Sequence, residues 1–331
     1  MRLVFNKTGY DTFIDFLKAY AIICVVIAHC FPSSLWNYCL FQVWADMQVP
    51  MFILIQVFHA YKRGTKPTIK WTPLLKRIVV PFVIIQIIIL LYRLWFSGQS
   101  AYDVLISSVV YGGYGPGSYY FWIYIQVAII LVLMYPLVQK LTRRQLTWLF
   151  LFFSVGCECC FSLINLPDVL YRLLAIRYLF LIPLALIWVN EGVILNVRNV
   201  LLSILSIIAV VFFSFWKVDL EPLFYNSGWA THRWICYFYL PTLLTYALWY
   251  VYRSINKSKL SFFIEKIAKS SYEIYLIQMM VFVMLPIYRL SFIHSGVFRL
   301  ISWMMLMFVL SIIGGIVMHN VLQKLLGEKQ K

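Results

Sequence analysis

Long apolar runs separated by short polar stretches make up most of the chain. Ten runs are long enough, at about 1.5 Å of helical rise per residue, to cross about 30 Å of hydrocarbon, the shorter ones with little tilt. Their apolar residues are continuous rather than alternating, which favours helices over the strands of a membrane barrel. The pattern therefore predicts an all-α polytopic membrane protein with about ten transmembrane helices. The ten runs span residues 13–31, 40–61, 78–96, 119–138, 146–164, 170–189, 200–215, 235–252, 271–288 and 300–321.

Composition places most of the chain in lipid. Hydrophobic residues make up 63% of its 331 residues and charged residues only 12%, against about 45–50% and about 25% in a typical soluble domain. A soluble core of this length cannot bury so much apolar surface. Composition therefore excludes an ordinary globular enzyme, a disordered chain and a disulfide-built secreted domain. No repeat, low-complexity tract or long linker divides the chain, so we expect one membrane domain over residues 1–331.

The 28 basic residues are unevenly distributed along the chain. With the N-terminus inside, 20 of them fall in the tails and inner connections, four in outer connections and four within apolar runs. Lys and Arg accumulate on the cytoplasmic side of membrane proteins. We therefore expect both termini in the cytoplasm and a multi-pass protein of the inner or plasma membrane. The same bias accounts for the formal charge of +16 without a nucleic-acid partner. The first run lacks a small-residue cleavage site and is expected to remain as a spanning helix.

The seven cysteines do not form a recognisable metal motif. Cys157, Cys159 and Cys160 cluster around Glu158, but a metal site needs partner ligands already in place and a polar shell around them. Small cysteines buried in a membrane helix are the favoured interpretation, and no metal is expected.

The first apolar segment carries three ionisable residues, Asp15, Lys18 and His29. Such residues are costly in lipid and often mark functional sites. At about 100° per residue, their spacing places Lys18 and His29 on one helix face, roughly 16 Å apart along the axis. Asp15 lies one turn from Lys18 and can pair with it. Two interpretations need no functional site. His29 can be a hydrogen-bonded histidine of the protein core, and the Lys18 ammonium can reach the inner membrane interface. Because both residues lie on one helix face, we favour a functional site. His29 would act as a base, and Lys18 would attract an anionic ligand.

Polar residues also interrupt later segments. Arg172 and Arg177 open the sixth segment, and a five-residue spacing separates them by about 140° on a helix, so they need not share a target. Glu158 in the fifth segment needs a cationic or hydrogen-bonding partner. Asp46 and Gln48 lie early in the second segment.

A stretch rich in Gly and Tyr, YGGYGPGSYYFW, spans residues 111–122. It lacks the Gly-Lys-Ser/Thr ending of a loop that cradles phosphates. We interpret it as a flexible lid or a sugar-facing loop that leads into Tyr120 and Trp122. For any one of its aromatic residues, the alternative is the belt of Trp and Tyr at a membrane interface.

Several of these stretches resemble, in order, the acyltransferase-3 family of membrane acyltransferases. Lys18, ten residues and His29 resemble the Arg, ten residues and His of that family's first helix. KRIVVPF (76–82) is similar to the basic, proline-ended start of its third helix. FWIYIQVAIILVLMYPLV (121–138) is similar to its Trp-led, proline-ended fourth helix, and SSYEIYLIQ (270–278) to a late helix. The resemblance spans most of the chain.

Three positions depart from the family pattern. Lys18 stands where the family usually has Arg, which keeps the charge but loses the bidentate fork for phosphate. Gln56-Val57 stands where a Ser-Gly pair is common, and Gln278 where a His is frequent.

The resemblance implies transfer of an acyl group, often acetyl, from cytoplasmic acyl-CoA to a hydroxyl of a cell-envelope glycan or its lipid-linked precursor. No metal is required. His29 would act as general base or transient acyl carrier, with Lys18 and Asp15 completing the catalytic set. Lys18 and Arg77 would hold the phosphates of CoA. Substrate-binding residues are expected to be Tyr120, Trp122, Arg172, Arg177 and Gln278. The expected partners are acyl-CoA, preferably acetyl-CoA, a glycan or lipid-linked sugar, and the lipid bilayer, with self-association left open.

Two other functions fit many helices with buried charges. The first is a transporter or flippase that moves a glycan or acyl intermediate without chemistry. An inverted repeat would favour it, and none is visible. The second is a subunit that scaffolds a polysaccharide synthase, for which Lys18 and His29 would be dispensable.

Overall fold

The computed structural model describes residues 2–5, 11–32, 38–96, 100–216, 239–255, 259–291 and 293–326. Most of this part of the chain is helical and it contains almost no strand, which confirms the all-α prediction. The predicted outer connection 216–234 lies almost entirely outside the described residues, as does the start of the eighth apolar segment.

Each of the ten predicted segments contains helix. Five of them form single helices over their described parts: α1 (Thr12–Cys30), α9 (Arg143–Leu163), α12 (Val197–Trp216), α14 (Leu240–Ile255) and α17 (Gly296–Leu325). The predicted segment 271–288 holds α16 (Ser271–Met284) and the start of a 3₁₀ turn (Ile287–Leu290). The other four are divided. The second segment holds α2 (Phe41–Trp44) and α3 (Gln48–Tyr61), and the fourth holds α7 (Tyr119–Leu133) and α8 (Tyr135–Lys140). The third lies in a stretch of α4 (Trp71–Leu74), a π-helical turn (Leu75–Val79) and α5 (Val80–Phe96), and the sixth in a stretch of α10 (Asp168–Leu173), a 3₁₀ turn (Ile176–Tyr178) and α11 (Leu181–Glu191).

Within the described residues, five helical stretches are long and apolar enough to cross a membrane by themselves. They are Thr12–Cys30, Phe41–Tyr61, Trp71–Phe96, Arg143–Leu163 and Gly296–Leu325. These lengths support the prediction of a membrane protein. The count of about ten spanning helices and the cytoplasmic termini stay predictions.

Prolines account for several of the divisions. Pro81 has no N–H to donate to the carbonyl of Arg77, and the helix widens into the π turn just before it. Pro136 lies in the first turn of α8, where the missing N–H leaves no intrahelical bond unmade, so α7 ends and α8 begins at Met134.

Two helices lie in stretches that we treated as connections. α6 (Ala101–Val110) begins at Ser100, whose hydroxyl accepts a hydrogen bond from the N–H of Asp103. This Ser-x-x-Asp spacing is a helix-start signal visible in the sequence. α15 (Lys259–Lys269) has apolar residues at 260, 263, 264 and 267, the spacing of an amphipathic helix. It packs along α1.

A short pair of antiparallel strands joins the N-terminal residues to the middle of the chain. β1 (Arg2–Leu3) pairs with β2 (Val193–Ile194), Leu3 opposite Val193. Gly192 precedes β2 with a φ of 77°, and a Cβ there would lie 2.1 Å from the carbonyl oxygen of Leu3, so only glycine fits.

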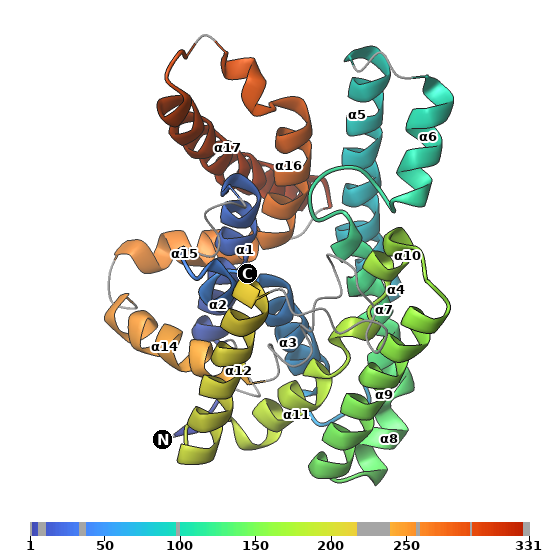
Figure 1. Cartoon of the computed structure of the whole chain (residues 1–331), viewed down its shortest axis with the longest axis vertical. Coiled ribbons are helices and arrows are strands. Elements are labelled where there is room, and N and C mark those ends of the chain that lie inside the picture. The colour runs from blue at the N-terminus through green and yellow to red at the C-terminus, as the bar shows by residue number, and fades with distance from the viewer. Residues whose placement is uncertain are drawn as a thin grey trace.

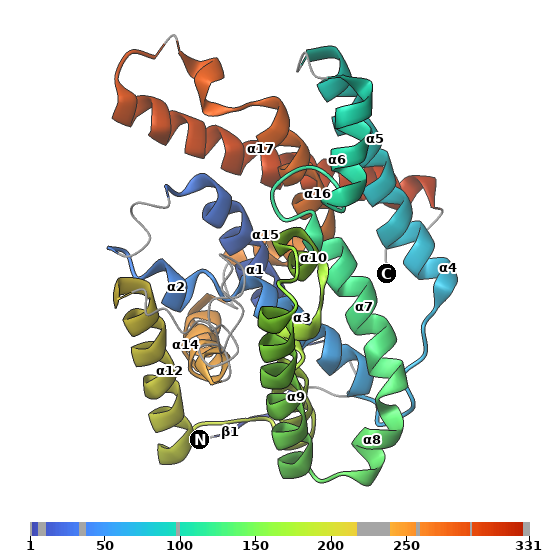
Figure 2. The same cartoon turned by 45° about the vertical axis from the view of Figure 1, so that its right-hand side comes forward.

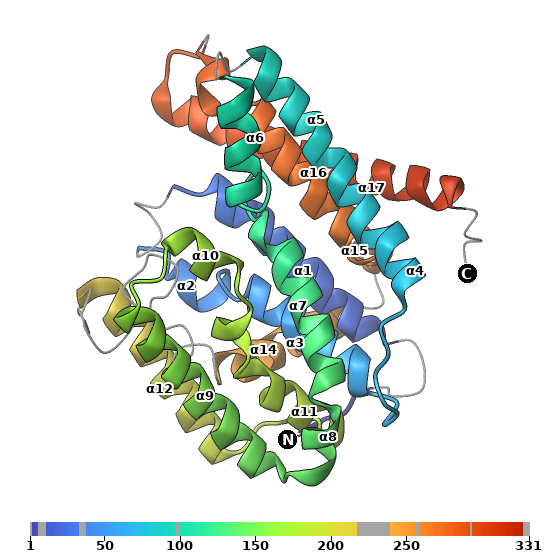
Figure 3. The ribbon, with the colours of Figure 1, turned by 90° about the vertical axis from the view of Figure 1, so that its right-hand side faces the viewer.

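α1 lies at the centre of the molecule, between two hydrophobic clusters. One cluster is built mainly by α3, α7 and α11, the other by α5, α16 and α17, and α1 contributes to both. Figures 1 and 3 show α1 and α3 in the middle, with α5, α16 and α17 on one side and α9, α11 and α12 on the other. Figure 2 shows α14 between α12 and α9 in that second half, and α14 packs against α12. The two halves meet along the polar face of α1.

Candidate active site

A cavity of about 520 Å³ lies where α1, α3, α7 and α16 meet. Polar and aromatic side chains line much of it, although most of the surrounding helix faces are apolar. Its lining residues with polar side chains are Lys18, His29, Asp46, Gln48, Gln56, His59, Tyr119, Tyr120, Tyr124, Ser271, Tyr272 and Tyr275. A cavity of this size with ionisable side chains in its lining, inside a membrane protein, is a binding-site candidate.

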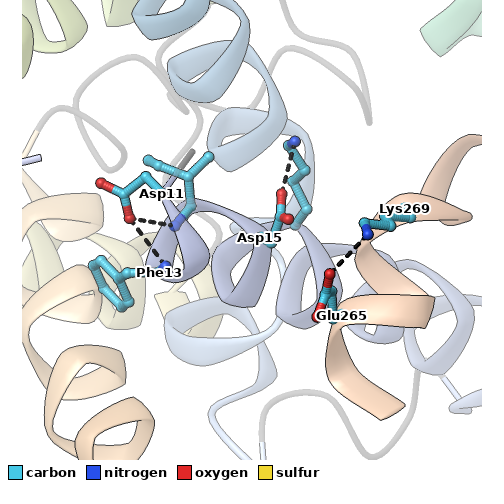
Figure 4. Close-up of polar contacts among 7 residues, drawn as sticks. Asp11, Phe13, Asp15, Glu265 and Lys269 are labelled. Carbon is cyan, nitrogen blue, oxygen red and sulfur yellow. Dashed lines mark hydrogen bonds and ion pairs between the residues drawn. The ribbon is translucent and has the colours of Figure 1, made fainter. Parts of the chain in front are cut away.

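Lys18 and His29 both line this cavity from α1. The sequence prediction that they share one helix face is thus confirmed. The Nζ of Lys18 lies 3.0 Å from Oδ1 of Asp15, whose side chain is buried one turn away. Asp15 is drawn in Figure 4 on α1, and the Glu265–Lys269 ion pair lies on the neighbouring α15. The carboxylate of Asp15 therefore orients the Lys18 ammonium.

His29 lies at the other end of this polar face, against a wall of backbone and aromatic rings. The ring of Phe282 on α16 meets it edge-on with centroids 6.1 Å apart. A Cβ added to Gly117 would lie 3.7 Å from His29 Nε2. The carboxylate of Asp46, also in the cavity lining, interacts electrostatically with the imidazole. The imidazole thus faces an open chamber with a carboxylate nearby.

The Gly-rich loop before α7 forms part of the cavity wall. Four of its glycines have positive φ, at 67° to 114°, which lets the chain turn back on itself. Two side chains of α16 hold it: Tyr275 donates to the Gly117 carbonyl at 2.9 Å, and Gln278 to that of Pro116 at 3.4 Å. On the other side, the Gln86 amide of α5 makes two hydrogen bonds with the backbone of Tyr114. These hydrogen bonds hold the loop as part of the cavity wall, which fits the predicted sugar-facing loop better than the predicted flexible lid.

We expect Gly115→Ala to destabilise this wall. A Cβ at Gly115 would lie 2.8 Å from Cβ and 3.0 Å from the carbonyl oxygen of Met279, at a φ of +100°. Strain of this kind costs about 1–3 kcal/mol, so the detergent-solubilised variant should unfold at a lower temperature in a thermal-shift assay. Gly156→Ala on α9 is the matched control, because an added Cβ there meets nothing within 4 Å. Equal melting temperatures for the two variants would contradict this assignment.

The predicted substrate residues divide into two groups. Tyr120 lines the cavity, with its ring edge-on to Tyr275 at 5.8 Å. Trp122, Gln278 and the two arginines of the sixth segment do not line it. The Trp122 indole donates to the carbonyl of Gly112 at 2.7 Å, so this side chain, like that of Gln278, holds the loop.

Arg172 and Arg177 lie together behind the cavity wall. Arg177 is buried, faces the ring of Tyr119 at 5.1 Å, and donates to the Arg172 carbonyl at 3.1 Å. Arg172 donates to the carbonyl of Tyr111 at 2.9 Å. The helical angle that we used to separate them does not apply, because the chain leaves α10 after residue 173 and turns before α11.

Glu158 has the partner that its burial requires. The hydroxyl of Tyr171 donates to its carboxylate, and Arg177 lies within electrostatic reach. This confirms the sequence expectation for Glu158. Among the described residues, no group of three or more His, Cys, Asp or Glu side chains could hold a metal ion.

A second cavity, of about 670 Å³, lies beside the first and is lined by basic side chains. The two cavities share Gln56, His59, Ile78 and Tyr124 in their linings. Arg77 of the π turn lines the second cavity but not the first. The cations of the second cavity are Lys62, Arg63, Lys66, Lys70 and Arg77. An aromatic chamber with a histidine therefore adjoins a basic vestibule across these four shared residues.

Sequence reasoning did not identify several of the lining residues. His59 lies where the two cavities join and interacts electrostatically with Lys18 and Lys62. Tyr124, Tyr272 and Tyr275 were also missed. Tyr124 lies four residues after the predicted Tyr120 on α7, and Tyr272 and Tyr275 are three apart on α16, so each pair presents one helix face. That spacing was visible in the sequence, but its convergence on His29 was not.

Fold and site together define a helical membrane protein whose internal chamber is lined by ionisable and aromatic side chains. A family model for the acyltransferase domain of the acyltransferase-3 type matches residues 11–320. The chain therefore belongs to the acyltransferase-3 family of membrane acyltransferases. No curated protein sequence and no solved structure matches it.

Proposed function

We propose that the protein is a membrane O-acyltransferase, with acetyl-CoA as the first donor to consider. It moves the acyl group from cytoplasmic acyl-CoA to a hydroxyl of a cell-envelope glycan or of its lipid-linked precursor. The observation that carries this proposal is the pairing of the two cavities: the chamber lined by His29 adjoins a vestibule lined by five cations. Family membership supports the acyl-transfer chemistry.

The basic vestibule suits the polyphosphate end of CoA. Its cations can make charge-assisted hydrogen bonds to phosphate oxygens, with Arg77 offering a bidentate fork. Both termini lie in the cytoplasm in this proposal, which places the vestibule connection 62–77 on the side that holds acyl-CoA. The inner or plasma membrane is the proposed location.

The pantetheine arm would pass from the vestibule to the chamber where the two linings overlap. Lys18, held by Asp15, adds a cation on the chamber side of this overlap, and His59 interacts electrostatically with it. An anionic donor is thus attracted along the same face of α1 that ends at His29.

His29 would act on the acceptor hydroxyl in the chamber. In the direct route its imidazole takes the hydroxyl proton as the oxygen attacks the thioester carbonyl. The carbon–sulfur bond then breaks, and the CoA thiolate takes the proton back from His29, leaving an ester and free CoA. In the carrier route the imidazole attacks the thioester carbonyl, the carbon–sulfur bond breaks, and the CoA thiolate takes the imidazole N–H proton and leaves as free CoA. The acceptor hydroxyl then attacks the acyl-imidazole, the carbon–nitrogen bond breaks, and the imidazole takes the hydroxyl proton. Asp46 lies near enough to stabilise a positive imidazole in either route.

The acceptor would lie against the tyrosines of α7 and α16. Tyr120 and Tyr275 present rings on which the C–H surface of a sugar can pack. Trp122, Arg172, Arg177 and Gln278 act one layer further out in this proposal. They position the glycine loop and Tyr119 rather than contact the substrate.

Transfer from labelled donor to a cell-envelope extract tests the function. Membranes that contain the protein, incubated with radiolabelled acetyl-CoA and an extract of envelope glycans and lipid-linked sugars, should pass label to the extract, and membranes without it should not. If acetyl-CoA passes no label, the same assay would be repeated with longer and acidic acyl-CoAs as donors. Failure with every donor overturns the proposal and favours transport without chemistry.

We expect Arg77→Gln to weaken donor binding. Loss of a charge-assisted phosphate contact should raise the KM for acetyl-CoA about tenfold while kcat changes little. The difference from the wild type should shrink at high salt, because salt screens charge attraction in an open vestibule. Arg144→Gln, an exposed arginine at the start of α9, is the matched control and should behave as the wild type. An unchanged KM in Arg77→Gln would remove Arg77 from the donor site.

A further inference from the structure

Asp46 and Gln48 bring two hydrogen-bond acceptors to the chamber, in the turn that leads into α3. Both side chains line it, and both are at least nine-tenths buried, with exposed fractions of 9% and 8%. The Gln48 amide nitrogen lies 3.5 Å from Oδ1 of Asp46, an arrangement that a carboxylate favours because it repels the amide oxygen. The Gln48 amide oxygen therefore lies on the side away from the carboxylate.

The Gln48 amide oxygen has no hydrogen-bond partner among the described residues. A buried acceptor left in this state destabilises the folded protein by about 1–3 kcal/mol. Such groups in native structures usually have a role in binding or catalysis. Because the side chain borders an open chamber, a donor group on a ligand is the natural partner.

The chemistry of this pair selects the kind of ligand group. An ionised carboxylate only accepts hydrogen bonds, and the Gln48 nitrogen is already directed at Asp46. The Gln48 amide oxygen, beside a carboxylate that can also only accept, therefore suits donors such as hydroxyls and disfavours a phosphate or a carboxylate. Asp46, Gln48 and His29 line the same cavity, so a ligand bound to the pair lies in the chamber that holds the imidazole.

We propose that Asp46 and Gln48 form a subsite for hydroxyl groups of a polyhydroxylated acceptor beside His29. This subsite rests on the acyl-transfer function proposed above and adds the acceptor's contacts to it. The basic vestibule and the Asp46–Gln48 subsite adjoin the chamber at different places, so donor and acceptor approach His29 from separate directions. The rings of Tyr119 and Tyr120 line the same chamber, which completes an amphipathic surface for a sugar.

Kinetics of Gln48→Met and Asp46→Asn test the subsite. Both changes conserve side-chain volume; the first removes the amide, and the second removes the charge but keeps one acceptor oxygen. Membranes would be assayed with radiolabelled acetyl-CoA against a dilution series of the extract of envelope glycans and lipid-linked sugars. We expect the half-saturating amount of extract to rise about fivefold for Gln48→Met and about tenfold or more for Asp46→Asn. The KM for acetyl-CoA should stay within about twofold of the wild type.

Gln323→Met on α17 is the matched control. It also removes one hydrogen-bonded amide, to His319, at a helix end that does not line the chamber. The control should keep wild-type half-saturation for both substrates. A rise in the KM for acetyl-CoA with unchanged acceptor saturation would place Gln48 in the donor site and overturn the proposal. Unchanged values for both substrates would overturn it as well.

A binding measurement separates this subsite from the transfer reaction. The same extract should raise the melting temperature of the detergent-solubilised wild type, and the rise should be lost in Gln48→Met, whatever the catalytic rate. Stabilisation without transfer would keep the subsite and reject the acyltransferase function. Transfer with equal stabilisation of wild type and variant would reject the subsite alone, and neither effect in the wild type would reject both.

Discussion

Replacement of His29 by glutamine should lower acyl transfer by about 10²–10⁴-fold, the range that a positioned general base contributes. Glutamine fills most of the space of the imidazole but cannot take a proton. The cavity wall formed by Gly117 and Phe282 should therefore stay in place. The measurement is the rate at which label passes from radiolabelled acetyl-CoA to envelope glycans, in membranes with equal amounts of protein.

His294→Gln is the matched control. His294 is exposed in the connection between α16 and α17 and lies outside the chamber lining, so its replacement should leave transfer unchanged. Wild-type transfer in His29→Gln would take His29 out of the mechanism. It would leave the chamber as a binding site without a base, which is the arrangement expected of a transporter.

An acid quench separates the two roles of His29. Labelled acetyl-CoA is mixed with the protein in the absence of acceptor, and the protein is then precipitated. Label retained by the wild type and absent from His29→Gln indicates the carrier route. No retained label, with His29-dependent transfer in the full reaction, indicates direct attack assisted by a general base.

Replacement of Gln56 by tryptophan should block the proposed path of the donor from vestibule to chamber. Gln56 lines both cavities and donates to the carbonyl of Tyr124 at 2.9 Å. In the proposed donor path, a bulky ring at this position would occupy the space that the pantetheine arm needs. Displacement of a donor by even about 1 Å lowers rates by about 10²-fold, so we expect at least that loss with acetyl-CoA.

Gln56→Ala separates blockage from loss of the hydrogen bond. Both variants lose the amide that bonds to the Tyr124 carbonyl, but only tryptophan fills the passage. The alanine variant should keep transfer within about tenfold of the wild type. Equal losses in the two variants would show that the amide itself matters. Full activity in Gln56→Trp would show that acyl-CoA reaches His29 by another route.

Helix positions and the polar face of α1 were predictable because each depends on residues close together in the chain. Apolar runs of about 20 residues must be helical in lipid, and the eleven-residue step from Lys18 to His29 brings both to one side of any straight helix. Sequence reasoning was less successful where the backbone leaves a regular helix. Arg172 and Arg177 converge because the segment breaks between α10 and α11, which helical periodicity cannot describe.

The roles of Trp122 and Gln278 required knowledge of what lies opposite them. A tryptophan and a glutamine beside a glycine-rich stretch suggest substrate contact. In the fold, both side chains instead donate hydrogen bonds to carbonyls of that stretch and hold it in place. Whether a polar side chain contacts a ligand or the backbone depends on partners that are distant in sequence, such as Pro116 for Gln278.

The sequence by itself determined the all-α membrane class, the family resemblance and the shared face of Asp15, Lys18 and His29. These follow from composition, from hydrophobic period and from spacing within one helix, all of which are local properties of the chain. Only the tertiary structure decided that Asp46 and Gln48 border the chamber of His29, and that Gln56 lies between this chamber and a basic vestibule. Cavities form where several helices fail to fill the space between them, and the packing of helices from distant parts of the chain decides where that occurs.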